Sequence, residues 1–225
     1  MSSYRLSVNR QSETNEGRER NISGPGFGIT SRYRMRMIRF PWYAVSVILI
    51  IIGDGDLSDY DDLGRASIVL AVAAMDSYFT EAFIEKLVPY LLSNRPSKRL
   101  VEILEKSGFG IADALQLLNQ FNPLSRIKKT LERALEKYVT QNTDKIDYLF
   151  LAFGYKDLSV HAANKTKRKR LLKDVRHLVE RRHQIVHDGD YYKNKKLRRF
   201  SQSSTTSDIQ ALEAFVGACE GILFP

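Results

Sequence analysis

The most constraining feature of this sequence is a long apolar segment over residues 65–93. Its apolar side chains occur on every side of a helix rather than on one face: Ile68, Val69, Leu70, Val72, Met75, Phe79, Phe83 and Leu87. A helix that is apolar all round is stable in water only when other elements surround it. The segment therefore predicts the central helix of a bundle. A kink is expected near Pro89, because proline removes a backbone hydrogen bond.

The chain beyond this segment also has a helical pattern. Apolar residues recur at helical spacing in five more stretches, which are 96–107, 111–121, 126–140, 144–153 and 165–187. Ser207 with Gln210 has the pattern of a capping box and predicts the start of a final helix. No strand pattern follows residue 53. We therefore predict an all-α fold, an up-and-down bundle of about five to six helices over residues 60–225.

Two segments precede the predicted bundle. Residues 1–40 form a basic arm without apolar periodicity, which we expect to be disordered. Residues 41–59 form an apolar segment and an acidic loop. The apolar run 42–52 is shorter than the roughly 20 residues that a spanning helix needs, so we expect it to pack on the core, with membrane contact as the alternative. The acidic loop lacks the glycine and the final glutamate of a calcium loop.

The charge of the chain is concentrated in one region. The 225 residues carry a formal net charge of +9, and residues 164–200 alone hold 14 basic and 4 acidic side chains. Such a cluster favours phosphate or another anion as a partner, unless it is only a solvated basic face. The single cysteine, Cys219, excludes an internal disulfide and a Cys-rich zinc site. It fits a reducing compartment, and we predict a cytoplasmic location.

The predicted basic helix carries one arginine and two histidines in a distinctive arrangement. At 100° per residue, Arg182 falls on the apolar stripe formed by Leu171, Val175, Leu178 and Ile185. His183 and His187 lie one turn apart on a neighbouring polar face. An arginine directed at a packed surface is costly unless an anion meets it. The helix end therefore predicts an anion site with two imidazoles beside it.

This combination suits metal-free cleavage of RNA. An imidazole that titrates near neutrality can take a proton from a 2′-hydroxyl or give one to a leaving oxygen. A planar guanidinium can hold the phosphate and stabilise its developing charge. Arg182 and His187 project about 140° apart on an ideal helix, so one copy converges poorly on one phosphate. A two-fold homodimer that brings both pairs to one groove is the natural prediction.

Further residues complete the predicted site. Asp76 is the only charge between Arg65 and Glu81, and we predict that it supports the site by pairing with Arg182, with a local hydrogen bond as the alternative. Asp188 is a second supporting candidate. The candidate RNA-binding residues share a basic side chain near the motif or in the loop after it: Arg176, Arg181, Lys193, Lys195, Lys196 and Arg198.

Two other interpretations use the same histidines. His183 and His187 have the spacing of a zinc-binding helix, but Gln184 stands where a metalloprotease needs glutamate as the base. A structural metal with Asp188 or His177 as a further ligand is left open, although we predict no metal and no cofactor. Alternatively, the histidines are solvated or only satisfy the last carbonyls of their helix.

The pattern Arg182-His183-x3-His187, followed by Asp-Gly, resembles the Arg-polar-x3-His motif of the HEPN superfamily. The apolar run 68–79 is similar to the first long helix of those domains, and the closest subfamily is the one named for RiboL-PSP proteins. The resemblance covers residues 60–223. It implies a homodimeric bundle with its site at the dimer interface. It also implies His187 as the catalytic histidine, Arg182 as the phosphate contact and His183 as the orienting polar residue.

The residues and the resemblance together predict a metal-independent endoribonuclease that leaves a 2′,3′-cyclic phosphate. The expected role is a toxin or antiphage defence effector, with an antitoxin or sensor protein as a candidate partner and no membrane partner. The alternative is a catalytically inactive helical module that binds RNA, a nucleotide or a partner protein. Both alternatives predict anion binding, so only a cleavage assay separates them.

Overall fold

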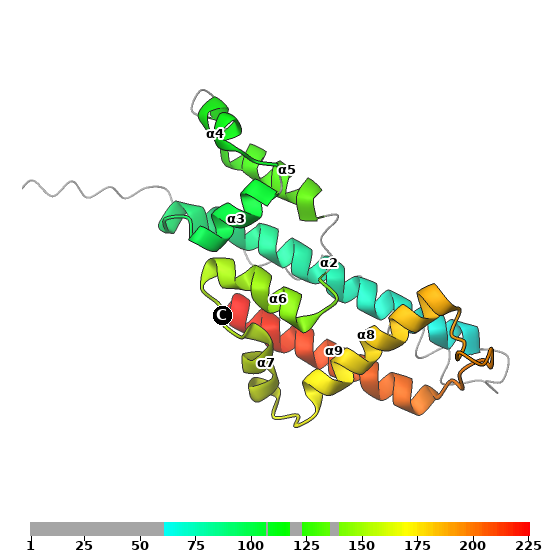
Figure 1. Ribbon diagram of the computed structural model, residues 1–225. Helices are drawn as coiled ribbons and strands as arrows, with labels where there is room; N and C mark the ends of the chain where they lie inside the picture. The colour runs from blue at the N-terminus through cyan, green and yellow to red at the C-terminus, as the bar shows by residue number, and fades with distance from the viewer. Residues whose placement is uncertain (1–60, 107, 118–122, 136–139) are drawn as a thin grey trace, which may run out of the picture.

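The computed structural model describes residues 61–106, 108–117, 123–135 and 140–225, which form an all-α fold (Figure 1). The predicted fold class is confirmed, although the described residues form eight α-helices rather than five to six. The predicted disordered arm 1–40 and the segment 41–59 lie outside the described residues. In chain order, the elements are α2 Asp61–Ser93, α3 Lys98–Lys106, α4 Ile111–Leu117, α5 Pro123–Leu135, α6 Thr143–Phe150, the 3-10 turn η2 Leu151–Phe153, α7 Leu158–Thr166, α8 Leu171–Asp188 and α9 Gln202–Leu223.

The helix α2 is the central element, as its all-round apolar pattern predicts. It crosses the whole molecule in Figure 1, with α6, α8 and α9 along one side and α3 and α5 on the other. Phe79 lies 5.9 Å from both Phe150 of α6 and Phe215 of α9, measured between ring centroids. Tilted and edge-on aromatic contacts of this kind add about 0.5–1.5 kcal/mol each beyond the burial of area. The aromatic cluster therefore joins α2 to the C-terminal half of the chain.

By length and composition, α2 could also cross a membrane, and it is the one described helix that meets this test. Most of its apolar side chains are nevertheless buried within the bundle, and Met75, Phe79, Phe83 and Leu87 have no exposed surface, although Leu70 and Leu92 are exposed. The helix continues through Pro89 to Ser93. The described structure thus accounts for the apolar character of α2 by packing against other helices.

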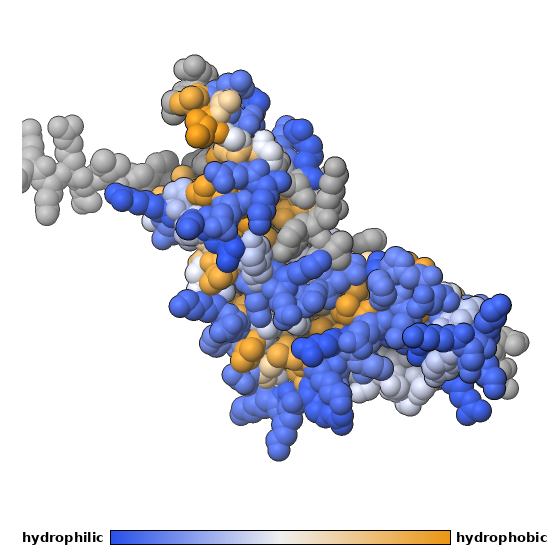
Figure 2. Space-filling view, in the orientation of Figure 1, coloured by the Kyte–Doolittle hydropathy of each residue, from blue (hydrophilic) through white to orange (hydrophobic). Residues whose placement is uncertain are grey.

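The helices α4 and α5 form an arm that projects from the bundle, and α3, whose Leu100 is buried in the core, lies at its base (Figure 1). Leu131 and Leu135 of α5 are buried and anchor this arm to the core. At the tip, Ile111 and Leu115 of α4 are exposed by 80% and 60%, and Figure 2 shows the apolar surface there. The opposite end of the molecule, where α8 ends, has a mainly hydrophilic surface in the same view.

Two predicted boundaries are wrong. The basic stretch predicted as one helix over 165–187 is divided, because α7 ends at Thr166, Lys167 adopts a left-handed conformation and α8 begins at Leu171. The last helix begins at Gln202 rather than near Ser207. Its N-cap is Ser201, whose hydroxyl accepts a hydrogen bond from the Ser204 N–H. The first turns of α9 are polar, so they carry no apolar period that marks them as helical.

The helix α8 lies between α2 and α9 and ends where the sequence predicts. Gly189 adopts a left-handed conformation and its N–H, like that of Asp190, donates to the Gln184 carbonyl. Leu171, Val175 and Leu178 are buried, as the predicted stripe requires. This packing fixes the rotation of α8 and therefore the direction in which each of its polar residues points.

Candidate functional site at the end of α8

The segment after α8 is an ordered turn rather than a free basic loop. Tyr191 and Leu197 form an isolated antiparallel bridge, and the Tyr192 N–H donates to the Lys196 carbonyl at 2.8 Å. The Arg198 N–H donates to the Asp190 carbonyl at 2.9 Å and closes the base of the turn. We call residues 190–198 the hairpin. It returns the chain to α2 and holds its exposed lysines beside the end of α8.

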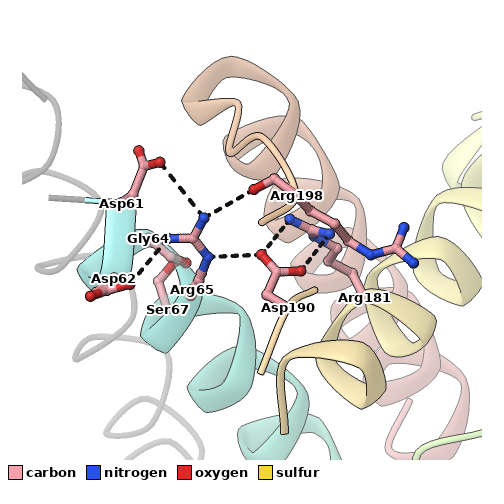
Figure 3. A network of polar contacts seen from close by, with 8 residues as sticks. All are labelled: Asp61, Asp62, Gly64, Arg65, Ser67, Arg181, Asp190 and Arg198. Atoms are coloured by element: carbon pink, nitrogen blue, oxygen red, sulfur yellow. Dashed lines mark hydrogen bonds and ion pairs between the residues drawn. The ribbon is translucent and has the colours of Figure 1, made fainter. Parts of the chain in front are cut away.

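A buried carboxylate joins the hairpin to two helices (Figure 3). Asp190 has no exposed surface, and its Oδ2 accepts a hydrogen bond from Arg65 Nε of α2 at 2.7 Å. Oδ2 also accepts a hydrogen bond from Nη2 of Arg181 on α8 at 2.7 Å, whereas Oδ1 lies 2.6 Å from Arg181 Nη1 as an ion pair without a hydrogen bond. We call Arg65, Asp190 and Arg181 the ion cluster. A buried charge is stable only when paired and hydrogen-bonded, and here each partner supplies that condition for the others.

The surroundings of the two arginines differ. Arg65 also bonds Asp62 and the Arg198 carbonyl, and the Asp61 carboxylate lies 3.7 Å away. Burial disfavours its charge, but the hydrogen bonds with Asp190 and Asp62 outweigh burial, so the pKa of Arg65 is raised. Burial lowers the pKa of Arg181, because the attraction of Asp190 only partly offsets it. Both groups stay charged at neutral pH, since arginine titrates far above it.

Arg182, the next residue on α8, is in the opposite situation. It is half-buried, and its Nε atom is buried without a hydrogen-bond partner. Nor does its guanidinium form an ion pair with any carboxylate of residues 61–106, 108–117, 123–135 or 140–225. The anion that the sequence argument requires for this arginine is therefore not supplied by the described part of the chain.

The two histidines of the motif are close to each other. His183 and His187 are exposed, and their ring centroids lie 4.3 Å apart with the ring planes inclined at 43°. On α8, Val186 lies between Arg182 and His183 in angle around the helix, and its side chain is 48% exposed. The motif face of α8, defined here as Arg182, His183, Val186 and His187, thus presents one cation, two imidazoles and one apolar side chain.

The predicted pair of Asp76 with Arg182 is wrong. Asp76 accepts hydrogen bonds from the backbone N–H and the hydroxyl of Thr140 and from the Gln141 side-chain amide. These donors come from the connection between α5 and α6, and they satisfy the carboxylate without a cation. Asp76 therefore has the local hydrogen-bonding role that the sequence left as an alternative.

The structure separates the predicted RNA-binding residues into two groups. Arg181 is bound to Asp190, and the Arg198 guanidinium stacks on the Tyr192 ring at 4.1 Å. The others are exposed, together with the supporting candidate Asp188: Arg176, Lys193, Lys195 and Lys196. Among these predicted RNA-binding residues, Arg181 is the one that would have to give up an ion pair to meet a phosphate.

Within the described ranges, no three histidine, cysteine, aspartate or glutamate side chains come together as a metal site would require. His177, the further ligand considered from the sequence, has its Nδ1 atom 2.9 Å from Oδ2 of Asp208 on α9. That contact ties α8 to α9. His177 is thus directed toward α9 rather than toward the motif histidines.

Sequence reasoning missed Arg65 and Asp190. Arg65 precedes the longest apolar stretch of α2, and Asp190 follows the glycine that ends α8. Each is a charged residue at the edge of a segment with apolar residues at helical spacing. A charge in such a position indicates that it forms an ion pair in the folded protein. The pairing itself joins residues 125 positions apart, which no local pattern indicates.

Comparison with known proteins gives one match. Residues 44–218 match the RiboL-PSP-HEPN family, which belongs to a superfamily associated with RNA cleavage. No curated protein and no solved structure matches the chain. The matched range covers most of the chain and contains the ion cluster and the whole motif face of α8. This all-α protein therefore belongs to the RiboL-PSP-HEPN family.

Proposed function

We propose that this protein is a metal-independent endoribonuclease that acts as a homodimer and leaves a 2′,3′-cyclic phosphate. The observation that carries the proposal is the contrast between neighbouring arginines. Arg181 is neutralised by Asp190, whereas Arg182 has a buried Nε without a partner and stands beside two imidazoles. A phosphodiester would supply the anion that Arg182 lacks.

The chemistry follows from proton transfer and charge. An imidazole takes the proton of the ribose 2′-hydroxyl, and the 2′-oxygen forms a bond to phosphorus as the bond to the 5′-oxygen breaks. His187 of the second copy gives a proton to the departing 5′-oxygen, so one proton is taken from the 2′-oxygen and one is returned to the 5′-oxygen. Arg182 stabilises the extra negative charge on the phosphate oxygens. His187 is assigned to proton transfer and His183 to orienting it.

The central experiment incubates the purified protein with structured RNA in EDTA. It compares the native chain with His187→Ala and Arg182→Ala. The matched control is His161→Ala, because His161 is an exposed histidine on α7 whose Nδ1 contacts two backbone carbonyls. We expect His187→Ala to lose at least about 100-fold in rate, a typical value for a general acid or base. We expect His161→Ala to cleave normally, and native products to end in a 2′,3′-cyclic phosphate.

Three outcomes would contradict the enzyme proposal. Equal cleavage by native and variant proteins would show that a contaminant cuts the RNA. Loss of cleavage in EDTA would show that a metal is required. Tight RNA binding by the native chain without any cleavage would favour the inactive binding module instead.

The dimer is tested through Val186, the exposed apolar residue on the motif face. Val186→Lys places a second cation one turn from Arg182, where we expect two copies of α8 to meet, and burying an unpaired charge is costly. Sedimentation velocity should show a dimer for the native chain and a monomer for the variant, with cleavage lost together with the dimer. A native monomer that cleaves RNA would refute the dimer.

The proposed biological role is a toxin or antiphage effector of a microbial cytoplasm, held in check by an antitoxin or sensor protein. Expression in a bacterial host should arrest growth, and His187→Ala should relieve the arrest while His161→Ala does not. Growth that continues while intact active protein accumulates would argue for a role in RNA processing.

A further inference from the structure

A second feature of α8 lies beside the motif face. A cavity of about 270 Å³ opens between α8, the hairpin and the start of α9. Its lining includes Gln184 of α8, Tyr192 and Arg198 of the hairpin, Arg199 directly after it, and Ser204 and Thr205 of α9. Small-molecule pockets usually measure about 300–1,000 Å³, so this volume suits one nucleotide rather than a larger ligand.

The charges around the cavity favour an anion. The cavity is lined by three arginines and one histidine, which are Arg181, Arg198, Arg199 and His177. Two carboxylates, Glu180 and Asp208, also line it. His177 is paired with Asp208, and Arg181 with Asp190, which leaves Arg198 and Arg199 opposite Glu180. The Nε atom of Arg198 is buried without a hydrogen-bond partner. In Figure 3 the Arg198 guanidinium points away from Asp190, so the ion cluster does not neutralise it.

The cavity also offers a stacking surface. Tyr192 is 48% exposed, and one face of its ring carries the Arg198 guanidinium at 4.1 Å. Unpaired RNA bases are recognised by stacking on aromatic rings and arginine planes, with hydrogen bonds to their edges from polar side chains. Gln184 supplies such a polar side chain, and it directly follows His183 in the sequence.

We infer that this cavity holds one unpaired nucleotide of the RNA substrate, next to the linkage that is cut. The base stacks at Tyr192, and Arg198 and Arg199 contact its phosphate. The inference rests on the proposed function, because it places the nucleotide beside the motif face of the same helix. It adds a requirement that the motif alone does not make, namely that the substrate is single-stranded at the flanking position.

The test measures binding separately from cleavage. His187→Ala protein is mixed with a fluorescent hairpin RNA, and Kd is read by anisotropy with and without Tyr192→Ala. Tyr191→Ala is the matched control, because Tyr191 is an equally exposed neighbour that lies outside the lining of the cavity. We expect Tyr192→Ala to weaken binding by about 5- to 100-fold and Tyr191→Ala by less than about 2-fold. Tyr192→Phe retains the ring and should bind like the parent.

An RNA series locates the nucleotide. A single abasic site is moved through the loop of the RNA, and one position should reproduce the loss caused by Tyr192→Ala. At that position the abasic site should not raise Kd any further in the Tyr192→Ala protein. Arg199→Ala should weaken binding to every RNA of the series, whereas Arg168→Ala, an exposed basic residue of the α7–α8 connection, should change it less.

Several results would overturn the inference. They are equal effects of Tyr192→Ala and Tyr191→Ala, an abasic penalty that persists without Tyr192, or a free mononucleotide that binds as tightly as the RNA. Each of these leaves cleavage by the native chain intact. Conversely, Tyr192-dependent RNA binding by a native protein that cuts no RNA would refute the proposed enzyme while supporting the nucleotide site.

Discussion

The face of α8 that carries Arg181 differs from the face that carries Arg182 in how its charge is satisfied. On the first face, Arg181 meets the fully buried Asp190, which also binds Arg65 of α2. On the second face, Arg182 has a buried Nε with no partner, and the neighbouring histidines are exposed. Both arginines come from one short run of the same helix, so composition does not explain the difference.

The contrast separates an arginine that holds the fold together from one that has no carboxylate partner among the described residues. Buried polar groups in folded proteins are nearly always hydrogen-bonded, so an exception calls for a reason. A site that binds an anion provides one, because the partner then arrives with the ligand. The ion cluster holds the C-terminal end of α8 rigidly, and the motif face on that end is left open.

The strongest test of this contrast removes the carboxylate of the ion cluster. Asp190→Ala leaves Arg65 and Arg181 buried without their shared anion, so we expect a loss of about 3–5 kcal/mol in the free energy of unfolding. The control is Asp208→Ala, whose partner His177 is 58% exposed, and which should cost about 0–1 kcal/mol. Urea denaturation followed by circular dichroism measures both. Equal losses would show that the buried cluster is no more important than a surface pair.

A second test compares the two arginines directly. Arg181→Met removes one of the two cations that hold Asp190, and we expect it to cost about 1.5–3 kcal/mol in unfolding free energy. Arg182→Met removes a guanidinium that pairs with no carboxylate in the described part of the chain, so its unfolding free energy should change by about 0.5 kcal/mol or less. The same denaturation assay applies. A larger loss from Arg182→Met would mean that this arginine is structural after all.

The third test concerns the contact between α2 and the segment that follows the hairpin. A methyl group at Gly64 would lie 2.0 Å from a ring carbon of Phe200, which is far closer than atoms can approach. Gly64→Ala should therefore displace Phe200 and cost about 1–3 kcal/mol of unfolding free energy. Gly217→Ala is the control, because nothing lies within 4 Å of the added methyl group there. If the two variants were equally stable, the close packing of Phe200 would be refuted.

The arrangement of the motif face could be predicted from the sequence because its residues lie on one helix. The spacing of Arg182, His183 and His187 fixes their relative directions once α8 is known to be helical and its buried stripe is known. The all-α class followed from the same kind of local pattern in α2. The roles of these three residues stay predictions until cleavage is measured.

Long-range pairing could not be predicted from the sequence. Arg65 and Asp190 meet only because α2 and the hairpin are folded together, and Asp76 meets Thr140 in a connection without a recognisable pattern. The break at Lys167 depends on a single left-handed residue within a run of charged side chains. Such features depend on which partner is available in three dimensions. The sequence suggested a pair between Asp76 and Arg182, but the Asp76 carboxylate is already satisfied by Thr140 and Gln141.

Cys219 extends the comparison to a buried titratable group whose surroundings disfavour its charged form. Burial, with a smaller contribution from Asp147, raises the pKa of the Cys219 thiol from its ordinary value of 9.0. Above pH 9 the unfolded chain releases this proton and the folded chain does not. The contribution of Cys219 to the free energy of unfolding is therefore fully present below pH 9. It then falls by about 1.4 kcal/mol for each pH unit above 9.

The check is the difference in unfolding free energy between the native chain and Cys219→Ala, measured at pH 7 and at pH 10. The variant loses packing at both pH values and is therefore less stable than the native chain. At pH 10 ionisation of the thiol stabilises the unfolded state of the native chain alone, so the difference in unfolding free energy should shrink by about 1.4 kcal/mol. The other titrating groups are common to both proteins and cancel in the difference. An equal difference at both pH values would mean that the thiol ionises as freely in the folded protein as in the unfolded chain. Cys219, unlike Asp190, would then need no compensating partner to carry a charge inside the bundle.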